Sequence, residues 1–216
     1  MKLPGNVRTK VRRTSVRWIV YPLVLPLFMS CMTLLPEGAP QSAIAPERAG
    51  QTVPETAAPA LRQSILTEAE KYIDVPYGSP PSVPATFDCS GFINYIFTRA
   101  ANMPLPTSSR GYLAIGREID FKDARPGDIL VFTSQPGGSN VDHVAILYKK
   151  SESGELRGSL LIHAVSLPLQ SATIRGNPRS PGVVIGELGK RADGNWQNEY
   201  FLSRYLCTKR YIEDVG

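Results

Sequence analysis

The feature that most constrains the fold is a single change of hydrophobic period near Pro126. Upstream, apolar residues recur at helical spacing, which predicts a helix from near Leu61, a second across Phe92–Ala100, and a short third after Ser108. Downstream, β-rich runs alternate with turn-forming segments and predict strands at 128–133, 143–149, 159–165, 182–187 and 201–212. Helices followed by antiparallel strands indicate an α+β domain, which we place at residues 61–216.

The charge distribution argues against a nucleic-acid partner. The chain has a formal charge of +5, but six of its 24 Lys and Arg lie in residues 1–31, which contain no acidic residue. From Met32 onward, 18 basic residues are balanced by 19 acidic ones, and no basic cluster marks the domain. Phosphate binding requires such a cluster, so we expect no nucleic-acid partner.

Residues 1–31 have the layout of an export signal. Basic residues precede an apolar stretch at 18–30, which is shorter than the ~20 residues of a membrane helix. Cys31 follows in a lipobox-like context, so we expect an exported protein of the cell envelope, anchored to a membrane by lipidated Cys31. Ordinary cleavage or an uncleaved anchor is the alternative. Residues 32–60 are rich in Pro and Ala, cannot bury a core, and are predicted to form a tether.

Cys89 is the candidate nucleophile. It follows Asp88, a good N-cap, at the start of the second predicted helix. The helix dipole and a nearby imidazolium are expected to lower the pKa of its thiol, and the free amides of the first turn could stabilise an oxyanion. A buried structural cysteine at a helix start is the alternative for Cys89 taken alone. Cys207, in a strand-like run, is predicted to be a buried structural thiol.

The chain has two histidines, and each lies in an apolar strand-like run. One such histidine is more often a core residue, but two of them beside a candidate nucleophile favour catalysis. His143 is the candidate base, and His163 is the candidate group that fixes its tautomer and supports its charge. Zinc binding is disfavoured because no HExxH or paired-cysteine spacing is present. We expect neither a metal nor an organic cofactor.

Six short motifs, in order, resemble those of the NlpC-type cell-wall cysteine peptidases. They lie at 75–78 (VPYG), 87–92 (FDCSGF), 105–110 (LPTSSR), 125–132 (RPGDILVF), 142–147 (DHVAIL) and 162–164 (IHA). Each motif alone is weak, but all six in this order are specific. The resemblance implies a papain-like fold, with N-terminal helices, one of them carrying the catalytic cysteine, packed on a five- to six-stranded antiparallel sheet.

The resemblance also implies roles for individual residues. Cys89 matches the nucleophile, His143 the base and His163 the third polar residue of the family. Tyr77 matches a tyrosine that lines the active site, and Ser90 matches a serine that holds substrate. With the N-cap Asp88, these two form the expected substrate-binding and oxyanion group.

The implied activity is hydrolysis of an amide bond in peptidoglycan stem peptides, at a γ-D-glutamyl bond to a diamino acid, by a monomer. The alternatives are an amidase or acyltransferase with the same Cys/His/His set, or an inactive wall-binding module. The chain departs from the family pattern after Tyr77, at Gly111-Tyr112, and in an insertion at 151–157 between the two histidines. These departures concern the walls of the cleft, and hence the identity of the substrate.

Overall fold

The computed structural model describes residues 57–166, 171–177, 179–191 and 200–213. These residues form two α-helices, three 3-10 turns and seven strands. The helices are α1 (Ala57–Glu70) and α2 (Cys89–Ala101), and the 3-10 turns are η1 (Ser109–Leu113), η2 (Phe121–Asp123) and η3 (Leu202–Arg204). The strands are β1 (Arg117–Ile119), β2 (Ile129–Thr133), β3 (Val141–Lys149), β4 (Leu160–Val165), β5 (Ser171–Arg175), β6 (Gly182–Arg191) and β7 (Tyr205–Arg210).

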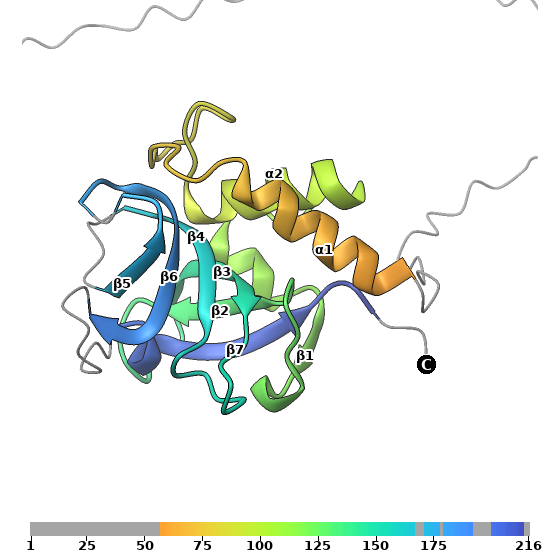
Figure 1. Cartoon of the computed structure of the whole chain (residues 1–216), viewed down its shortest axis with the longest axis vertical. Coiled ribbons are helices and arrows are strands. Elements are labelled where there is room, and N and C mark those ends of the chain that lie inside the picture. Colours follow the sequence, from red (N-terminus) through yellow and green to blue (C-terminus); the bar gives the residue numbers. More distant parts are fainter. Residues whose placement is uncertain (1–56, 167–170, 178, 192–199, 214–216) are drawn as a thin grey trace, which may run out of the picture. The chain divides into compact units, whose positions relative to one another are not determined.

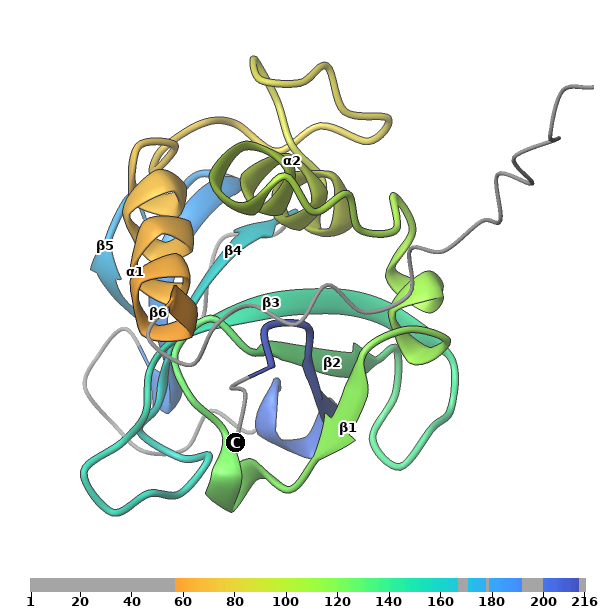
Figure 2. The ribbon, with the colours of Figure 1, turned by 90° about the vertical axis from the view of Figure 1, so that its right-hand side faces the viewer.

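The strands form one curved antiparallel sheet in the order β1-β7-β2-β3-β4-β6-β5. Both helices lie on the same face of this sheet (Figures 1 and 2). Helix α2 packs against β3 and β4, the two central strands that carry the histidines. The first turn of α2 is therefore held near the start of β3.

Alternating side chains of the central strands build two apolar cores, one on each face of the sheet. On the helical face, Val144 and Ile146 of β3 pack with residues of α1 and α2. On the opposite face, Ala145 and Leu147 pack with Phe132, and the loops around η2 and η3 cover them. Each fully buried large apolar side chain contributes ~1.5–3 kcal/mol to folding, so both faces fix the position of β3.

The two ends of α2 are set by local chemistry. At the N-terminus, the Asp88 side chain caps the helix and accepts a hydrogen bond from the backbone N–H of Gly91 at 2.6 Å. At the C-terminus, Asn102 adopts a left-handed conformation with φ 51°, and its N–H donates to the Phe97 and Thr98 carbonyls. The capped helix prediction is confirmed, and the short third helix is found as η1.

All five predicted strands are present, as β2, β3, β4, β6 and β7. The sheet has seven strands and not five or six, because β1 and β5 were not anticipated at its two edges. In the predicted run 201–212, residues 202–204 form η3 and the strand begins only at Tyr205. Helix α1 begins at Ala57, four residues before Leu61, because Ala58 is fully buried and Pro59 lies in the first turn, where no intrahelical N–H is needed.

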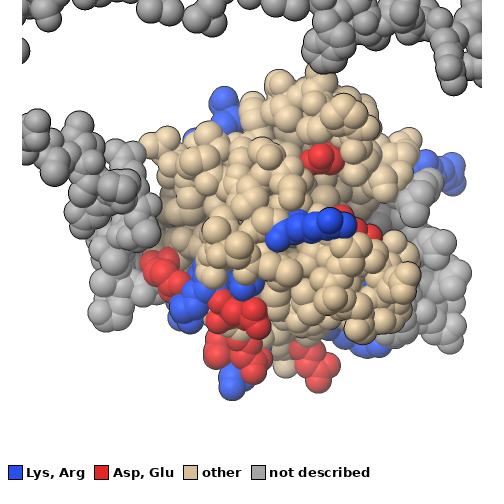
Figure 3. Space-filling view, turned by 180° about the vertical axis from the view of Figure 1, so that it is seen from behind, with Lys and Arg blue, Asp and Glu red and all other residues tan. Residues whose placement is uncertain are grey.

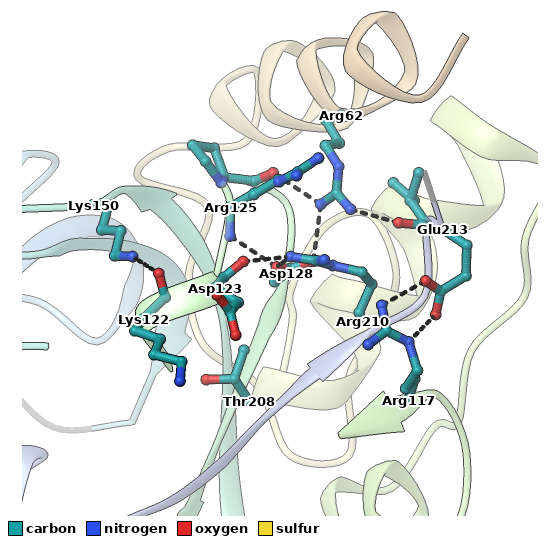
Figure 4. Close-up of polar contacts among 12 residues, drawn as sticks. Arg62, Arg117, Lys122, Asp123, Arg125, Asp128, Lys150, Thr208, Arg210 and Glu213 are labelled. Atoms are coloured by element: carbon teal, nitrogen blue, oxygen red, sulfur yellow. Dashed lines mark hydrogen bonds and ion pairs between the residues drawn. The ribbon is translucent and has the colours of Figure 1, made fainter. Parts of the chain in front are cut away.

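A buried ion cluster ties α1 to the sheet (Figure 4). Asp128, immediately before β2, is fully buried and accepts from Arg62 of α1 at 2.8 Å and from Arg210 of β7 at 2.8 Å. Its carboxylate also accepts from the backbone N–H of Arg125 at 2.8 Å. The aspartate of the RPGD motif therefore joins three elements that are distant in sequence.

On the face shown in Figure 3, Lys and Arg side chains lie among Asp and Glu and do not form one basic patch. None of the helices in the part of the chain that the structure describes is both long and apolar enough to cross a membrane. The predicted export signal, Cys31 and the tether up to residue 56 lie outside the described residues.

Candidate active site

Cys89 is the first residue of α2, in the position the sequence predicts. Gly91, two residues later, has no room for a side chain, since an added Cβ would lie 2.9 Å from the Asp88 carboxylate and 3.3 Å from Pro81. The glycine thus lets the capping carboxylate and the loop before α2 close over the first turn. The first turn of α2 therefore holds the Cys89 side chain in a fixed position.

Ser90 connects the first turn of α2 to the segment at 105–110 (LPTSSR). Its hydroxyl lies 3.2 Å from the Asp88 carboxylate and 3.0 Å from the Thr107 carbonyl oxygen. The Ser90 carbonyl accepts from the hydroxyl of Tyr112 at 3.4 Å. The structure therefore places Ser90 in the network that holds the helix start, and its contact with substrate stays a prediction.

The Cys89 thiol is almost completely buried, and it donates to the Asp142 carbonyl oxygen across 3.8 Å. Burial raises the pKa of the thiol to about 11, and nearby Asp88 acts in the same direction, although backbone N–H groups, including that of Val144, oppose the rise. The expected lowering of this pKa is wrong for the structure, because desolvation outweighs the helix-start amides. Cys89 is a neutral thiol at neutral pH.

The two histidines form a direct pair. His143 of β3 and His163 of β4 lie with Nε2 and Nδ1 2.9 Å apart. Burial lowers the pKa of His143 to about 4, and it lowers the pKa of His163 well below its ordinary value, with the charge of His143 adding to the effect. Both imidazoles are therefore neutral at neutral pH.

Phe201 completes the surroundings of this pair. Its ring centroid lies 5.2 Å from that of His143 and 5.3 Å from that of His163. Phe132 of β2 lies 5.9 Å from the His143 ring and 5.3 Å from the Phe201 ring, so these three rings pack together. The sequence pattern predicted Phe201 only as part of a strand, and nothing local marks it as a neighbour of the histidines.

Cys89 and His143 meet at the same end of β3. The thiol lies against the backbone of Asp142, on the helical side, while the imidazole packs with Phe132, on the other side of the strand. In this arrangement the thiol donates to the Asp142 carbonyl and not to the imidazole. The structure brings the three predicted residues to one strand end, and their joint action in catalysis remains a prediction.

Tyr77 is tied to the segment that precedes Cys89, and its role in the active site stays a prediction. Its backbone pairs with Phe87, two residues before Cys89. Burial raises the pKa of the Tyr77 phenol, and the neighbouring groups of Cys89 and Asp88 raise it further.

Tyr112 is a second tyrosine close to the site, and the sequence analysis marked it only as a departure from the family pattern. Its side chain is fully buried, and burial raises the pKa of its phenol, with smaller effects from Tyr211, Cys89 and Asp88. The hydroxyl that donates to Ser90 therefore helps to hold the helix start. Cys207 is buried and unbridged, as predicted. Within the described ranges, no group of three or more His, Cys, Asp or Glu side chains is placed to hold a metal ion.

Comparison with known sequences identifies proteins that are similar to this chain. Residues 74–178 match the NlpC/P60 family. The gamma-DL-glutamyl hydrolase of Bacillus subtilis is 41% identical over 73 residues, which are 32% of this chain and 17% of that protein. The probable endopeptidase p60 of Listeria monocytogenes is 37% identical over 82 residues, which are 38% of this chain and 16% of that protein. The chain thus matches only about a sixth of the length of each relative.

Two solved structures share the fold. An NlpC/P60 family protein from Bacillus cereus has a TM-score of 0.53 at 20% identity, over 70% of this chain and 40% of that one. A Staphylococcus aureus protein described as similar to lipoprotein, NLP/P60 family, has a TM-score of 0.51 at 26% identity, over 71% and 42%. Residues 74–178 thus match an NlpC/P60 family domain, and the α+β fold is the papain-like one that the sequence predicts.

Proposed function

We propose that this domain is a cysteine endopeptidase that hydrolyses an amide bond in peptidoglycan stem peptides. The observation that carries the proposal is the direct His143–His163 pair at the end of the strand against which Cys89 is mounted. A thiol, a neutral base and a group that orients the base are the parts that acyl transfer through a cysteine requires. The names of the two curated relatives, a hydrolase and an endopeptidase, support the same class of reaction.

In the proposed reaction, His143 takes the proton of the Cys89 thiol as the sulfur attacks the substrate carbonyl carbon. Backbone amides at the start of α2 stabilise the oxyanion. The carbon–nitrogen bond then breaks, the proton passes from His143 to the leaving amine, and a thioester remains on Cys89. Water, deprotonated by His143, attacks the thioester and releases a carboxylic acid and the free thiol.

A neutral resting thiol fits this sequence of steps. Because the pKa of Cys89 is raised and that of His143 is lowered, no thiolate–imidazolium pair is stored in the resting site. Proton transfer must accompany attack, and it requires a rearrangement that moves the thiol from the Asp142 carbonyl to the imidazole. The proposed mechanism is therefore general-base catalysis.

For the bond that is cut, we propose a γ-D-glutamyl bond to a diamino acid. The name of the Bacillus subtilis relative, which includes glutamyl hydrolysis, supports this choice. We further propose that the protein is exported and anchored at the cell envelope through lipidated Cys31. Metabolic labelling with a palmitate analogue should tag the wild type and not Cys31→Ala, and an unlabelled wild type would contradict the anchor alone.

Incubation of the full chain with purified muropeptides, followed by mass spectrometry, tests the activity. The wild type should produce two fragments whose summed mass exceeds that of the substrate by one water, and Cys89→Ala should produce none. Fragments that carry an added amine, when one is supplied, would assign an acyltransferase. Binding of muropeptides without any product would assign an inactive wall-binding module.

A further inference from the structure

Arg204 lies at the same end of the sheet as the candidate catalytic residues. Across the sheet, Tyr205 of β7 pairs with Phe132 of β2, and Phe132 pairs with His143 of β3. Arg204 is the residue immediately before Tyr205, and its backbone carbonyl accepts from the Thr133 hydroxyl at 3.2 Å. It therefore stands one position beyond the row that contains His143.

The guanidinium group of Arg204 is held in place by its neighbours. Nε donates to the Ser134 carbonyl at 3.3 Å and Nη1 to the Tyr200 carbonyl at 2.9 Å. The group also lies over the Tyr200 ring, 4.0 Å from its centroid. Two hydrogen bonds to carbonyl oxygens and the contact with an aromatic ring hold the planar cation in place. The entropy cost of each further hydrogen bond that it makes is therefore lower.

In the part of the chain that the structure describes, neither hydrogen bond of the Arg204 guanidinium is to a carboxylate. Among the described residues, Nη2 has no hydrogen-bond acceptor within bonding distance, and no ion pair with Arg204 is formed. The positive charge of Arg204 affects the ionisation of the Asp142 carboxyl. Burial raises the pKa of that carboxyl, and the charge of Arg204 partly offsets the rise.

Asp142 also connects Arg204 to the nucleophile. Its carbonyl oxygen accepts from Cys89, while its carboxyl lies within the electrostatic reach of Arg204. Cys89 and Arg204 thus flank the same residue at the start of β3.

We propose that Arg204 binds a free carboxylate of the peptide substrate and selects for substrates that carry one. This inference rests on the proposed function, and it adds a specificity residue outside the six motifs. Guanidinium groups bind carboxylates through paired, charge-assisted hydrogen bonds, and Nη2 together with the second N–H of Nη1 provides such a pair. Stem peptides contain carboxylates of two sources, on the glutamyl residue and at the peptide terminus.

The test measures binding and not turnover, so that it does not depend on hydrolysis. The full chain with Cys89→Ala serves as the parent, and isothermal titration gives Kd for a synthetic stem peptide. Two further peptides carry an amide in place of either the glutamyl or the terminal carboxylate. The parent should bind one of these amides about 10- to 100-fold more weakly than the acid, which identifies the carboxylate bound.

Arg204→Gln in the same background should reduce that ratio to about one, and Arg204→Lys should leave an intermediate ratio, because Lys retains the charge without the planar pair. Arg175→Gln is the matched control, since Arg175 of β5 is paired with Glu70 at the other edge of the sheet and should leave the ratio unchanged. Equal Kd values for acid and amides in the parent, or a ratio that Arg204→Gln leaves intact, would overturn the inference, as would the absence of binding. If the wild type hydrolyses no muropeptide but the parent still binds the acid more tightly than the amide, only the proposed function is overturned.

Discussion

Nε2 of His143 lies 2.9 Å from Nδ1 of His163, so a single proton must lie between the two rings. If His143 donates it, Nδ1 of His143 is unprotonated and can accept the thiol proton. If His163 donates it, neutral His143 carries its own proton on Nδ1 and cannot act as the base. The orienting role of His163 is therefore to accept, which keeps His143 in the tautomer that catalysis needs.

Side-chain substitutions can distinguish the base role of His143 from the orienting role of His163. His143→Ala and His143→Gln should both lose about 10²- to 10⁴-fold in turnover, because an amide cannot carry the proton at neutral pH. His163→Ala should be strongly impaired, whereas His163→Gln and His163→Asn should recover part of the loss, because an amide oxygen still accepts from Nε2. Turnover on muropeptides, measured beside melting temperature, checks this. Equal recovery by Gln at both positions would contradict the assignment.

The two described cysteines offer a matched pair, since both are free and equally buried, each with 7% of its surface exposed. Cys89→Ala should abolish hydrolysis and leave the melting temperature almost unchanged, because it removes a thiol and little core volume. Cys207→Ala should retain activity. Mass spectrometry of the products and thermal unfolding measure the two effects. Retained turnover in Cys89→Ala would rule out Cys89 as the nucleophile.

The lowered pKa values of the histidines predict how stability depends on pH. Between the ordinary imidazole pKa of ~6.5 and about 4, where His143 titrates in the folded protein, the unfolded chain binds protons that the folded protein does not. The free energy of unfolding should therefore change little from about pH 7.5 to about 6.5 and fall as the pH decreases toward 4. His163 contributes in the same direction, since its pKa is also lowered.

Thermal unfolding from about pH 7.5 to 4.5 measures this effect. The double variant His143→Gln/His163→Gln removes every histidine from the chain and should flatten the profile. Hydrogen bonds and ion pairs lower the pKa values of Glu68 and Glu70 below 4.5, so these carboxylates lose their stabilising charge only at more acidic pH. A melting temperature that is independent of pH in this window for the wild type would show that the imidazoles are not buried as neutral groups.

The sequence predicts the parts of the fold that have a local cause. Asp88 caps α2 through its own side chain, and the long apolar runs of β2, β3 and β4 identify themselves as strands. Strand β1 has only three residues, and it forms because Arg117–Ile119 pairs with β7, which is remote in the sequence. Ala58 is buried at the start of α1, but a small residue in an Ala/Pro-rich stretch gives no signal of burial.

In the candidate site, too, some properties have a local cause and others depend on tertiary packing. The positions of Cys89, His143 and His163 on their elements follow from local patterns and from the family resemblance. The pKa of Cys89 does not, because its burial depends on how closely α2 packs on β3. The same holds for Phe201, which reaches both imidazoles only after β7 joins β2. Local sequence predicts which groups are present, and tertiary packing sets their ionisation.

Asp128 provides the last prediction, on stability. Asp128→Asn keeps the shape of the side chain but removes the negative charge that Arg62 and Arg210 share in the interior. Removal of one partner from a buried ion cluster costs about 3–5 kcal/mol, because the remaining charges stay desolvated. At ~2–4 °C per kcal/mol for a domain of this size, the melting temperature should fall by roughly 6–20 °C. Glu213→Gln is the control: it breaks the exposed pair with Arg117 and should cost less than about 1 kcal/mol. Equal shifts in the two variants would show that burial of Asp128 adds nothing to its ion pairs.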